Sequence, residues 1–340
     1  MGSESSTIYS KEKVIDKKTR HVSFGYTWYL SSEIPISLYR ARRIKTFLLP
    51  CQLGYDPIRL DDSTYREIIA SFKFIRLLDL HNMGIKTIPN SIKKLKHLRY
   101  LDLSENFDIE MLPNSIVKLY NLQTLKLFEC KRLKELPRDI NKLVNLRFLE
   151  IDRCWDLTHM PNGLGQLTNL QTLSRFVMSK GRIDSVPRSY GGLKELGRLN
   201  ELRGNLSIEN LNQVKDAALE CKDANLKEKQ CLDRLDLNWV GVNIDETGVV
   251  CDMSTVEALQ PHINLKALRL NRYGGVIFPH WLVTLTNLVR FELYSCKKSQ
   301  YLPSLDQFPS LKIIYLYGLD SLEHISNSER DNSDSLFYPS

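Results

Sequence analysis

The sequence predicts an α/β fold, a solenoid in which one short unit is repeated along the chain. The first observation is a period of 23 or 24 residues, at which a leucine recurs at Leu78, Leu101, Leu125 and Leu149. The second is an apolar residue two places after each leucine, followed nine or ten residues later by a proline that has an apolar residue before it. This pattern at this period is typical of a leucine-rich repeat solenoid, or horseshoe.

Within each unit the spacing of the apolar residues changes once. In Leu101-Asp102-Leu103 apolar and polar residues alternate, which predicts a strand with its leucines on one face. After Pro113 the apolar residues return at steps of three, which predicts a helical or 3₁₀ segment. A single unit cannot bury its leucines alone, so the units must stack around one core. We expect a parallel β-sheet on the concave face, with short helices, 3₁₀ turns and loops on the convex face.

A small polar side chain recurs three residues after the second apolar position of the strand. The residues at this turn position are Asn106, Cys130, Cys154 and Cys296. Leucine-rich repeats carry Asn or Cys here, and a free cysteine is usually a small buried residue. We expect these side chains to satisfy backbone groups of the turn, and we assign them no catalytic or metal-binding role.

The regularity of the repeat divides the chain into five segments. Residues 1–20 are polar and charged, which predicts a flexible lead-in. Residues 21–73 contain two strand-like stretches and aromatic bulk, and we interpret them as irregular first repeats that cap the array. Regular repeats cover residues 74–175, and irregular repeats with insertions follow over 176–325. We expect residues 326–340 to be a polar tail at a truncated end, because another repeat would begin after it.

Composition and charge argue against several classes of function. The 47 basic and 40 acidic residues give a net charge of +7 that is spread along the chain, so we expect no nucleic-acid partner. The locally basic stretch 92–99 alternates with core leucines, and we interpret it as a solvated convex face. No apolar run is long enough to span a membrane, and the first 20 residues lack the features of a signal peptide. The odd number of cysteines, seven, favours a reducing compartment.

The sequence contains none of the catalytic motifs that we considered. There is no P-loop, no H-E-x-x-H, no C-x-x-C and no serine elbow. Cys221-Lys222-Asp223 is similar to the Cys-x-Asp element of bacterial leucine-rich repeat ubiquitin ligases, but their catalytic residues lie in a separate helical domain that this sequence lacks. We therefore predict that the chain is not an enzyme and that it binds no cofactor.

The outward positions of the predicted strands form two candidate surfaces. Over the regular repeats these residues are largely acidic with some aromatics, and we assign them to an intramolecular-contact face: Asp79, Tyr100, Asp102, Lys126, Phe128, Glu150 and Asp152. Over the later repeats they are rich in Tyr, Trp and Arg, which dominate binding hot spots. We assign these to a protein-binding face: Asp236, Trp239, Arg269, Arg290, Tyr294, Tyr315 and Tyr317.

Three stretches carry a family resemblance that extends over nearly the whole chain. Residues 19–24 (TRHVSF) are similar to a first strand, residues 202–211 (LRGNLSIENL) to a mid-array segment, and residues 273–282 (YGGVIFPHWL) to the repeat after it. In these stretches the chain resembles the leucine-rich repeat region of plant intracellular nucleotide-binding (NB-ARC), leucine-rich repeat disease resistance proteins of the coiled-coil class. The coiled coil, the P-loop domain and the Met-His-Asp motif of that family are missing from this sequence.

The resemblance implies that the chain is the recognition module of an intracellular plant immune receptor. In such receptors the repeat region senses a pathogen effector or a guarded host protein, and it packs against the nucleotide-binding domain to hold that domain inactive. The resemblance therefore implies protein partners, a cytoplasmic location and a part in plant defence and the hypersensitive response. ADP or ATP would belong to the absent upstream domain, so nucleotide binding is assigned to no residue of this chain.

Three other functions stay open at this point. The chain could be a general intracellular scaffold or adaptor, which a P-loop upstream of Met1 would argue against. It could be an extracellular receptor ectodomain, in which case Asn205, in its glycosylation sequon, would carry sugar. It could be a ubiquitin ligase, in which case Cys221→Ala would abolish ubiquitin transfer.

Overall fold

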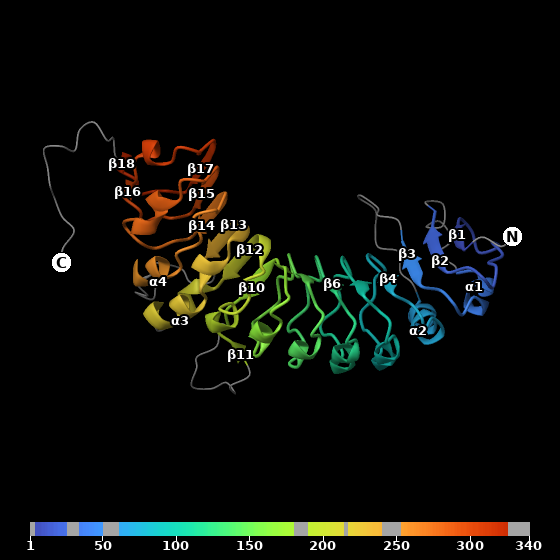
Figure 1. Cartoon of the computed structure of the whole chain (residues 1–340). Coiled ribbons are helices and arrows are strands. Elements are labelled where there is room, and N and C mark those ends of the chain that lie inside the picture. The colour runs from blue at the N-terminus through green and yellow to red at the C-terminus, as the bar shows by residue number, and fades with distance from the viewer. Residues whose placement is uncertain are drawn as a thin grey trace, which may run out of the picture. The chain divides into compact units, whose positions relative to one another are not determined.

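The computed structural model consists of two compact units, one formed by residues 1–175 with 181–191 and the other by 176–180 with 192–340. Each unit contains one large parallel β-sheet, whose strands are connected by helices and 3₁₀ turns (Figure 1). This confirms the predicted repeat architecture. The prediction expected one continuous sheet, whereas the structure has two large sheets, one in each unit. The described residues are 4–25, 34–49, 61–179, 190–213, 217–239 and 253–325.

The sheet of the first unit has eight strands, each parallel to its neighbours. Its register follows the repeat, because Leu78, Leu101, Leu125 and Leu149 stand beside one another on adjacent strands. All four side chains are fully buried, and burying one leucine contributes ~1.5–3 kcal/mol. The strands, in their order in the sheet, are β1 (Ser5–Ile8), β2 (His21–Phe24), β3 (Thr46–Leu48), β4 (Leu77–Asp79), β5 (Tyr100–Asp102), β6 (Thr124–Lys126), β7 (Phe148–Glu150) and β9 (Thr172–Leu173).

The segments that return the chain to the next strand of this unit are mostly 3₁₀ helices. Two of them directly follow Pro89 and Pro113, whose fixed backbone angle suits a first turn. The longest return segment, α2, buries Tyr65, Ile68 and Ile69 on one helical face. The return segments are α1 (Ile36–Arg40), α2 (Asp62–Ser71), η2 (Asn90–Lys94), η3 (Asn114–Lys118), η4 (Ile140–Lys142) and η5 (Leu164–Gln166), and a small antiparallel pair joins β8 (Met160–Pro161) to β11 (Tyr190–Gly191).

The start of the chain differs from the predicted flexible lead-in. Residues Ser5–Ile8 form β1, which pairs in parallel with β2. Ile8 is fully buried, and the backbone N–H of His21 donates to the Glu4 carbonyl at 3.0 Å. The prediction rested on the polar and charged composition of residues 1–20, from which a four-residue strand with one buried side chain does not stand out.

The sheet of the second unit has six strands, and the five from β12 to β17 are parallel to their neighbours. From β12 onward they are five to eight residues long, which is longer than the three-residue strands of the regular repeats. Within the described residues the last strand pairs on one side only, and its Leu316 is 40% exposed. The strands, in sheet order, are β10 (Arg175–Val177), β12 (Arg203–Glu209), β13 (Cys231–Asn238), β14 (Ala267–Asn271), β15 (Arg290–Tyr294) and β17 (Ile313–Tyr317).

The return segments of the second unit are more varied than those of the first. The indole N–H of Trp281, on η10, donates to the carbonyl of Val256, on α4, at 3.0 Å, and both side chains are buried. The segments are η7 (Leu193–Glu195), η8 (Leu211–Gln213), α3 (Ala217–Asp223), η9 (Leu226–Glu228), α4 (Met253–Ala258), η10 (His280–Thr284) and η11 (Leu305–Gln307), and a small parallel pair joins β16 (Tyr301–Leu302) to β18 (His324–Ile325).

A left-handed backbone residue follows the strand in each regular repeat. It stands two places after the second apolar residue, and its φ lies between 53° and 61° at Asn82, Glu105, Glu129 and Arg153. In the second unit four residues take this position, with φ between 54° and 66°: Asn210, Arg272, Ser295 and Gly318. Only a minority of non-glycine residues adopt such angles, so their recurrence shows that the turn is a property of the repeat. The next residue is the one at the Asn/Cys turn position.

One buried cation lies among the return segments of the second unit. Lys229 is 0% exposed and immediately follows η9. Its ammonium group donates to the Leu196 carbonyl at 2.8 Å, and it lies 3.4 Å from the Asn225 carbonyl oxygen and 3.5 Å from Asn200 Oδ1. These contacts connect two return segments of neighbouring repeats. Burial lowers the pKa of Lys229 to about 8, because the charged form loses its hydration.

We expect Lys229 to make the free energy of unfolding rise with pH in the alkaline range. Between the folded-state pKa of about 8 and the ordinary value of 10.5, the unfolded chain holds one proton more than the folded chain. Stability must therefore increase with pH, by at most about 1.4 kcal/mol per pH unit. Urea unfolding of the wild type and of Lys229→Met from about pH 7 to about pH 9.5 measures this contribution. An equal pH dependence of the two proteins would contradict it.

Candidate functional site

The cysteines at the turn positions connect each repeat to the one before it. Cys130 Sγ donates to the carbonyl of Leu103, the second apolar residue of the preceding repeat, at 3.2 Å. Burial raises the pKa of Cys154 to about 12, so this thiol stays protonated and can donate. The corresponding bonds run from Cys154 Sγ to Leu127 O at 3.1 Å and from Cys296 Sγ to Leu270 O at 3.6 Å.

Asn106 makes five hydrogen bonds at the same turn position. It is fully buried, and its amide provides two N–H donors and a strong oxygen acceptor, whereas a cysteine thiol provides one weak donor and a weak acceptor. The amide therefore satisfies backbone groups of two repeats. Nδ2 donates to the carbonyls of Leu80 (2.9 Å), Leu103 (2.8 Å) and Ser104 (3.3 Å), and Oδ1 accepts from the backbone N–H groups of Met83 (3.1 Å) and Ile85 (2.9 Å).

The open face of the first sheet, meaning the side chains that point away from its leucines, contains two buried aspartates. Asp79 and Asp102 are 5% and 9% exposed. Asp102 accepts from the backbone N–H of Ser104 at 2.9 Å and from the hydroxyl of Tyr100 at 3.0 Å. Asp79 Oδ1 accepts from the backbone N–H of His81 at 3.1 Å and lies 2.7 Å from Nδ1 of its ring. The prediction that these two carboxylates face solvent is wrong, because a short side chain folds back onto the amide two residues ahead.

Four other predicted residues of this face are half-buried and reachable by a partner. Lys126 and Glu150 stand beside each other on adjacent strands and form an ion pair of 3.0 Å. The guanidinium of Arg153 lies 5.4 Å from the centre of the Phe128 ring, and Asp152 is partly exposed. A partly exposed ion pair contributes little to stability, so these two charges can pair instead with the charges of another surface.

The open face of the second sheet is charged in its centre and aromatic at one edge. Three rows of side chains cross this face, and each row consists of residues that stand beside one another on adjacent strands. From β13 to β17, the rows are Arg234, Ala267, Arg290 and Ile313; Asp236, Arg269, Glu292 and Tyr315; and Asn238, Asn271, Tyr294 and Tyr317.

A buried glutamate holds three arginines in the centre of this face. Glu292 is 1% exposed and accepts from both terminal nitrogens of Arg234, at 3.0 and 3.1 Å. Arg269 Nε donates to it at 2.6 Å, and Arg290 Nη1 lies 3.4 Å from its Oε1. Asp236 accepts from Arg234 Nε at 2.8 Å. We call these five residues the Glu292 cluster. With three arginines and two carboxylates, the cluster has a net charge of +1 when both carboxylates are ionised.

Burial opposes the ionisation of both carboxylates in the Glu292 cluster, but their pKa values shift in opposite directions. At Glu292 the hydrogen bonds from Arg234 and Arg269 outweigh burial, so the pKa of Glu292 lies below its ordinary value. At Asp236 burial outweighs the attraction of Arg234 and Arg269, so the pKa of Asp236 is raised. Glu292 is therefore the firmly charged acceptor that fixes the guanidinium groups.

Three tyrosines continue the cluster into an exposed aromatic edge. Tyr315 and Tyr317 are 47% and 69% exposed. The guanidinium of Arg269 lies 5.1 Å from the ring centre of Tyr294, and that of Arg290 lies 5.7 Å from the ring centre of Tyr315. The rings of Tyr294 and Tyr317 are 6.3 Å apart. Cation–π contacts at this distance orient the rings, so the arginines that Glu292 fixes also position the tyrosines.

Trp239 does not belong to this face, and its prediction as a binding residue is wrong. The side chain is 4% exposed, and its ring lies 5.4 Å from that of Tyr273. Trp239 stands two places after Leu237 but is not left-handed there, unlike the equivalent residues of the regular repeats. The backbone therefore stays extended past the end of β13, and alternation places this side chain on the same side as Leu235 and Leu237, which face the core. Tyr273 occupies the turn position of the next repeat and provides a ring for the indole to pack against. The prediction followed the residue type instead of the alternation.

Sequence reasoning missed two residues of the Glu292 cluster, Arg234 and Glu292. Their contact joins residues 58 positions apart and crosses the intervening strand β14, so no spacing in the sequence indicates it. The available signal was Glu292 itself, an outward acidic residue whose row neighbour in the preceding repeat is Arg269. A carboxylate surrounded by arginines on adjacent strands is expected to pair with them.

Other types of site find no support in the described ranges. Those ranges contain no group of three or more His, Cys, Asp or Glu side chains that could hold a metal ion. None of the helices described there combines the length and apolar character needed to cross a membrane. Cys221, considered for ubiquitin transfer, is 1% exposed on α3, whereas reactive cysteines are partly accessible.

Two family models match the chain, and both describe leucine-rich repeats. The model described as R13L1/DRL21 LRRs matches residues 193–319, within the second unit. The model described as Zer-1-like, Leucine-rich repeats matches residues 89–185, all of which except 176–180 belong to the first unit. A solved structure, the Leptospira interrogans LRR protein LIC12759, aligns over 90% of this chain and 94% of its own at 16% identity, with a TM-score of 0.40.

Plant disease resistance proteins are similar to nearly the whole chain. RGA1 of Solanum bulbocastanum is 40% identical over 322 residues, which are 90% of this chain and 31% of that protein. The Arabidopsis thaliana disease resistance protein At3g14460 is 38% identical over 323 residues, which are 92% of this chain and 22% of that protein. The chain thus spans less than a third of either relative. It is a leucine-rich repeat region of the kind that plant disease resistance proteins carry.

Proposed function

We propose that this chain is the recognition module of an intracellular plant immune receptor and that the open face of its second sheet binds the recognised protein. That protein would be a pathogen effector or a host protein that the receptor guards. The similarity to disease resistance proteins supports the setting. The observation that carries the surface assignment is the pair of exposed tyrosines, Tyr315 and Tyr317, beside arginines held by Glu292. Tyrosine and arginine are the residue types in which binding hot spots are enriched.

The Glu292 cluster would make this face ready to bind. Its guanidinium groups are already ordered, so a partner would lose less free energy to ordering arginine side chains when it docks. The excess positive charge favours a partner that presents a carboxylate to the centre of the face. The tyrosine edge would then cover an apolar part of that partner, because a tyrosine buries a large ring while its hydroxyl keeps a polar contact.

The open face of the first sheet would make a second contact, with the nucleotide-binding domain of the same receptor. Lys126, Phe128, Glu150 and Asp152 are the residues that this face offers. A recognised protein can shift a receptor between two states only by binding one state better than the other. In this proposal the chain itself is non-catalytic and cytoplasmic, and it responds through changes in these protein contacts. ADP or ATP would be held by the nucleotide-binding domain.

We expect that replacing Tyr315 and Tyr317 together by alanine in the full-length receptor abolishes its response to the pathogen. A hot-spot residue contributes ~2 kcal/mol or more, which corresponds to roughly a thirtyfold loss of affinity for each tyrosine. The response of leaves that express the receptor measures this effect. Tyr301→Ala is the matched control, since Tyr301 is 46% exposed on β16, outside the sheet that carries the face.

The same assay separates the proposed contacts. Lys126→Glu on the first face should give a response without any pathogen, because it would weaken the contact that restrains the nucleotide-binding domain. A receptor that accumulates and responds normally without Tyr315 and Tyr317 would reject the recognition face. If the receptor binds its partner proteins normally but neither the wild type nor any variant gives an immune response, the scaffold function would be favoured instead.

A further inference from the structure

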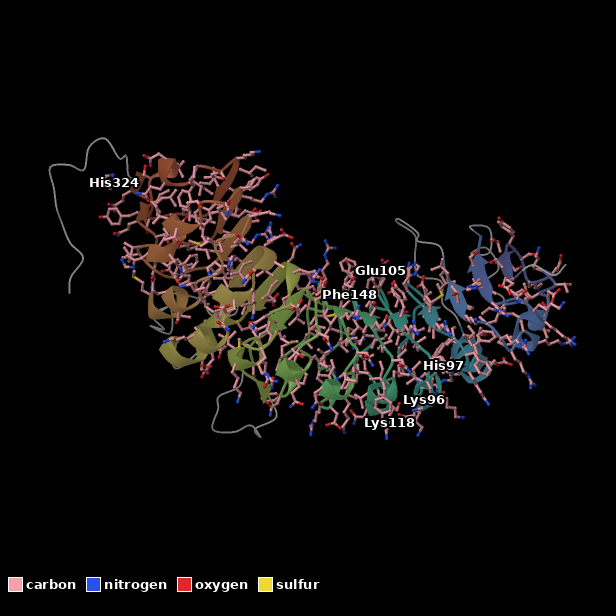
Figure 2. All side chains as sticks on the ribbon, in the orientation of Figure 1. Lys96, His97, Glu105, Lys118, Phe148 and His324 are labelled. Carbon is pink, nitrogen blue, oxygen red and sulfur yellow. The ribbon has the colours of Figure 1, made fainter. Side chains whose placement is uncertain are left out.

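A basic groove lies in the first unit, at the edge of the sheet where the strands begin. It has a volume of about 260 Å³ and is lined by Arg20, Arg43, Lys45, Phe74, Arg76 and His97. No carboxylate is among these residues. Figure 2 shows His97 beside Lys96, on the side of the return segments and away from Glu105 and Phe148. The groove is therefore a different surface from the open face discussed above.

The backbone of the repeat places three of these cations side by side. Arg20, Lys45 and Arg76 each stand immediately before a strand, at the starts of β2, β3 and β4. The N–H of Lys45 donates to the Arg20 carbonyl at 2.6 Å, and that of Arg76 donates to the Lys45 carbonyl at 2.7 Å. Neighbouring strands are ~4.8 Å apart, so the three cations extend over roughly 10 Å of the sheet edge.

The cations of the groove are poorly neutralised by the protein. Across the described ranges, the ion pairs place only Glu4 near the groove, 3.5 Å from Arg20 and with a largely exposed side chain. No ion pair is found there for Arg43, Lys45 or Arg76. Elsewhere in the first unit cations are paired: Arg132 and Lys134 both contact Glu110, at 2.9 and 2.7 Å. The groove thus concentrates positive charge that an anion from outside can neutralise.

An exposed aromatic ring forms one wall of the groove. Phe74 is 54% exposed, and its ring stacks on His97 with 5.8 Å between ring centres and 23° between planes. An exposed phenylalanine among cations leaves an apolar surface uncovered. It could contact the carbon skeleton or ring of an anion whose charges are held by the arginines.

We propose that this groove binds a small anion carrying two or more phosphate groups. Arginine forks match the oxygens of phosphate in geometry and charge. The volume is slightly below that of a typical drug-sized ligand site, which fits a compact anion. Along the sheet edge, the residue that stands immediately before the next strand is Arg99, and the one before the strand after that is the uncharged Gln123. The row of cations is therefore too short to bind a long polyanion. The sequence predicts no cofactor in this chain, and this ligand would be an exception to that prediction.

Calorimetric titration of the 340-residue chain with inorganic tripolyphosphate, at about 0.15 M salt, tests the proposal. We expect one saturable site that binds tripolyphosphate more tightly than sulfate. The variant Arg43→Gln with Arg76→Gln should weaken binding by at least about tenfold, since each charge-assisted hydrogen bond is strong. Both residues are exposed, so their replacement leaves the core intact. Arg147→Gln is the matched control, an exposed arginine at the same repeat position but outside the groove.

Four outcomes would overturn the proposal. The first is an absence of tripolyphosphate binding by the wild type. The second is equal binding by wild type and groove variant, or an equal loss in Arg147→Gln, which would indicate general charge attraction. The third is binding to vesicles of anionic phospholipid without binding of tripolyphosphate, which would indicate a membrane surface. The fourth is binding of polyglutamate without binding of tripolyphosphate, which would indicate an acidic protein segment.

Discussion

Replacing Glu292 by glutamine is expected to lower the free energy of unfolding of the second unit by ~3 kcal/mol or more. The substitution keeps the shape of the side chain and removes the charge that Arg234, Arg269 and Arg290 share. The three arginines are then left with Asp236 alone, and removing one partner of a buried ion pair costs roughly 3–5 kcal/mol. Urea unfolding followed by tryptophan fluorescence measures this loss, because Trp239 and Trp281 are both buried in this unit.

A matched control separates burial from charge. Asp233→Asn removes an exposed carboxylate of the same unit that pairs with Lys266 at 2.7 Å, and it should cost less than about 1 kcal/mol. The pH dependence gives a second control. Because the pKa of Glu292 is lowered on folding, its contribution is complete above the ordinary value of 4.5 and is lost as the pH falls below it. If Glu292→Gln and Asp233→Asn had equal small effects, the Glu292 cluster would not be a stabilising centre.

Replacing Asn106 by alanine is expected to destabilise the first unit by ~4 kcal/mol. The substitution removes five hydrogen bonds in a fully buried site and leaves the N–H groups of Met83 and Ile85 without their acceptor. Each buried polar group that loses its partner costs ~1–3 kcal/mol. Hydrogen exchange of the Met83 and Ile85 amides should accelerate in the variant, which locates the loss at this turn.

Cys130→Ala is the matched control at the next turn position, because Cys130 makes one hydrogen bond there in place of five. Its cost should be about 1 kcal/mol. Asn106→Cys should fall between the two, because a thiol could restore only the bond to the Leu80 carbonyl. Equal costs of Asn106→Ala and Cys130→Ala would show that the asparagine fills space and does not organise the turn.

The regular strands were predictable because one local pattern determines both their direction and their burial. Leu101 and Leu103 alternate with Asp102, and the same spacing recurs 24 residues later. The turn position was predictable for the same reason, since Asn106 and Cys130 keep a constant distance from the strand. The strand β1 was not predictable, because one buried residue in a charged stretch produces no pattern.

The candidate site was predictable only in part, because it depends on contacts between repeats. Tyr315 and Tyr317 follow from alternation, whereas the contact between Glu292 and Arg234 depends on register across three strands. Trp239 shows that alternation decides the side of a strand even when the residue type suggests a binding role. The basic groove did have a signal in the sequence, since Arg20, Lys45 and Arg76 all stand directly before a strand.

The affinity of this chain for the protein that triggers the immune response is the most direct measurement of the proposed recognition. Calorimetric titration should compare the wild type with the Tyr315→Ala, Tyr317→Ala double variant and with Tyr301→Ala. We predict that the double variant binds at least about a hundredfold more weakly and that Tyr301→Ala binds like the wild type. An unchanged affinity of the folded double variant would contradict the assignment of recognition to the open face of the second sheet.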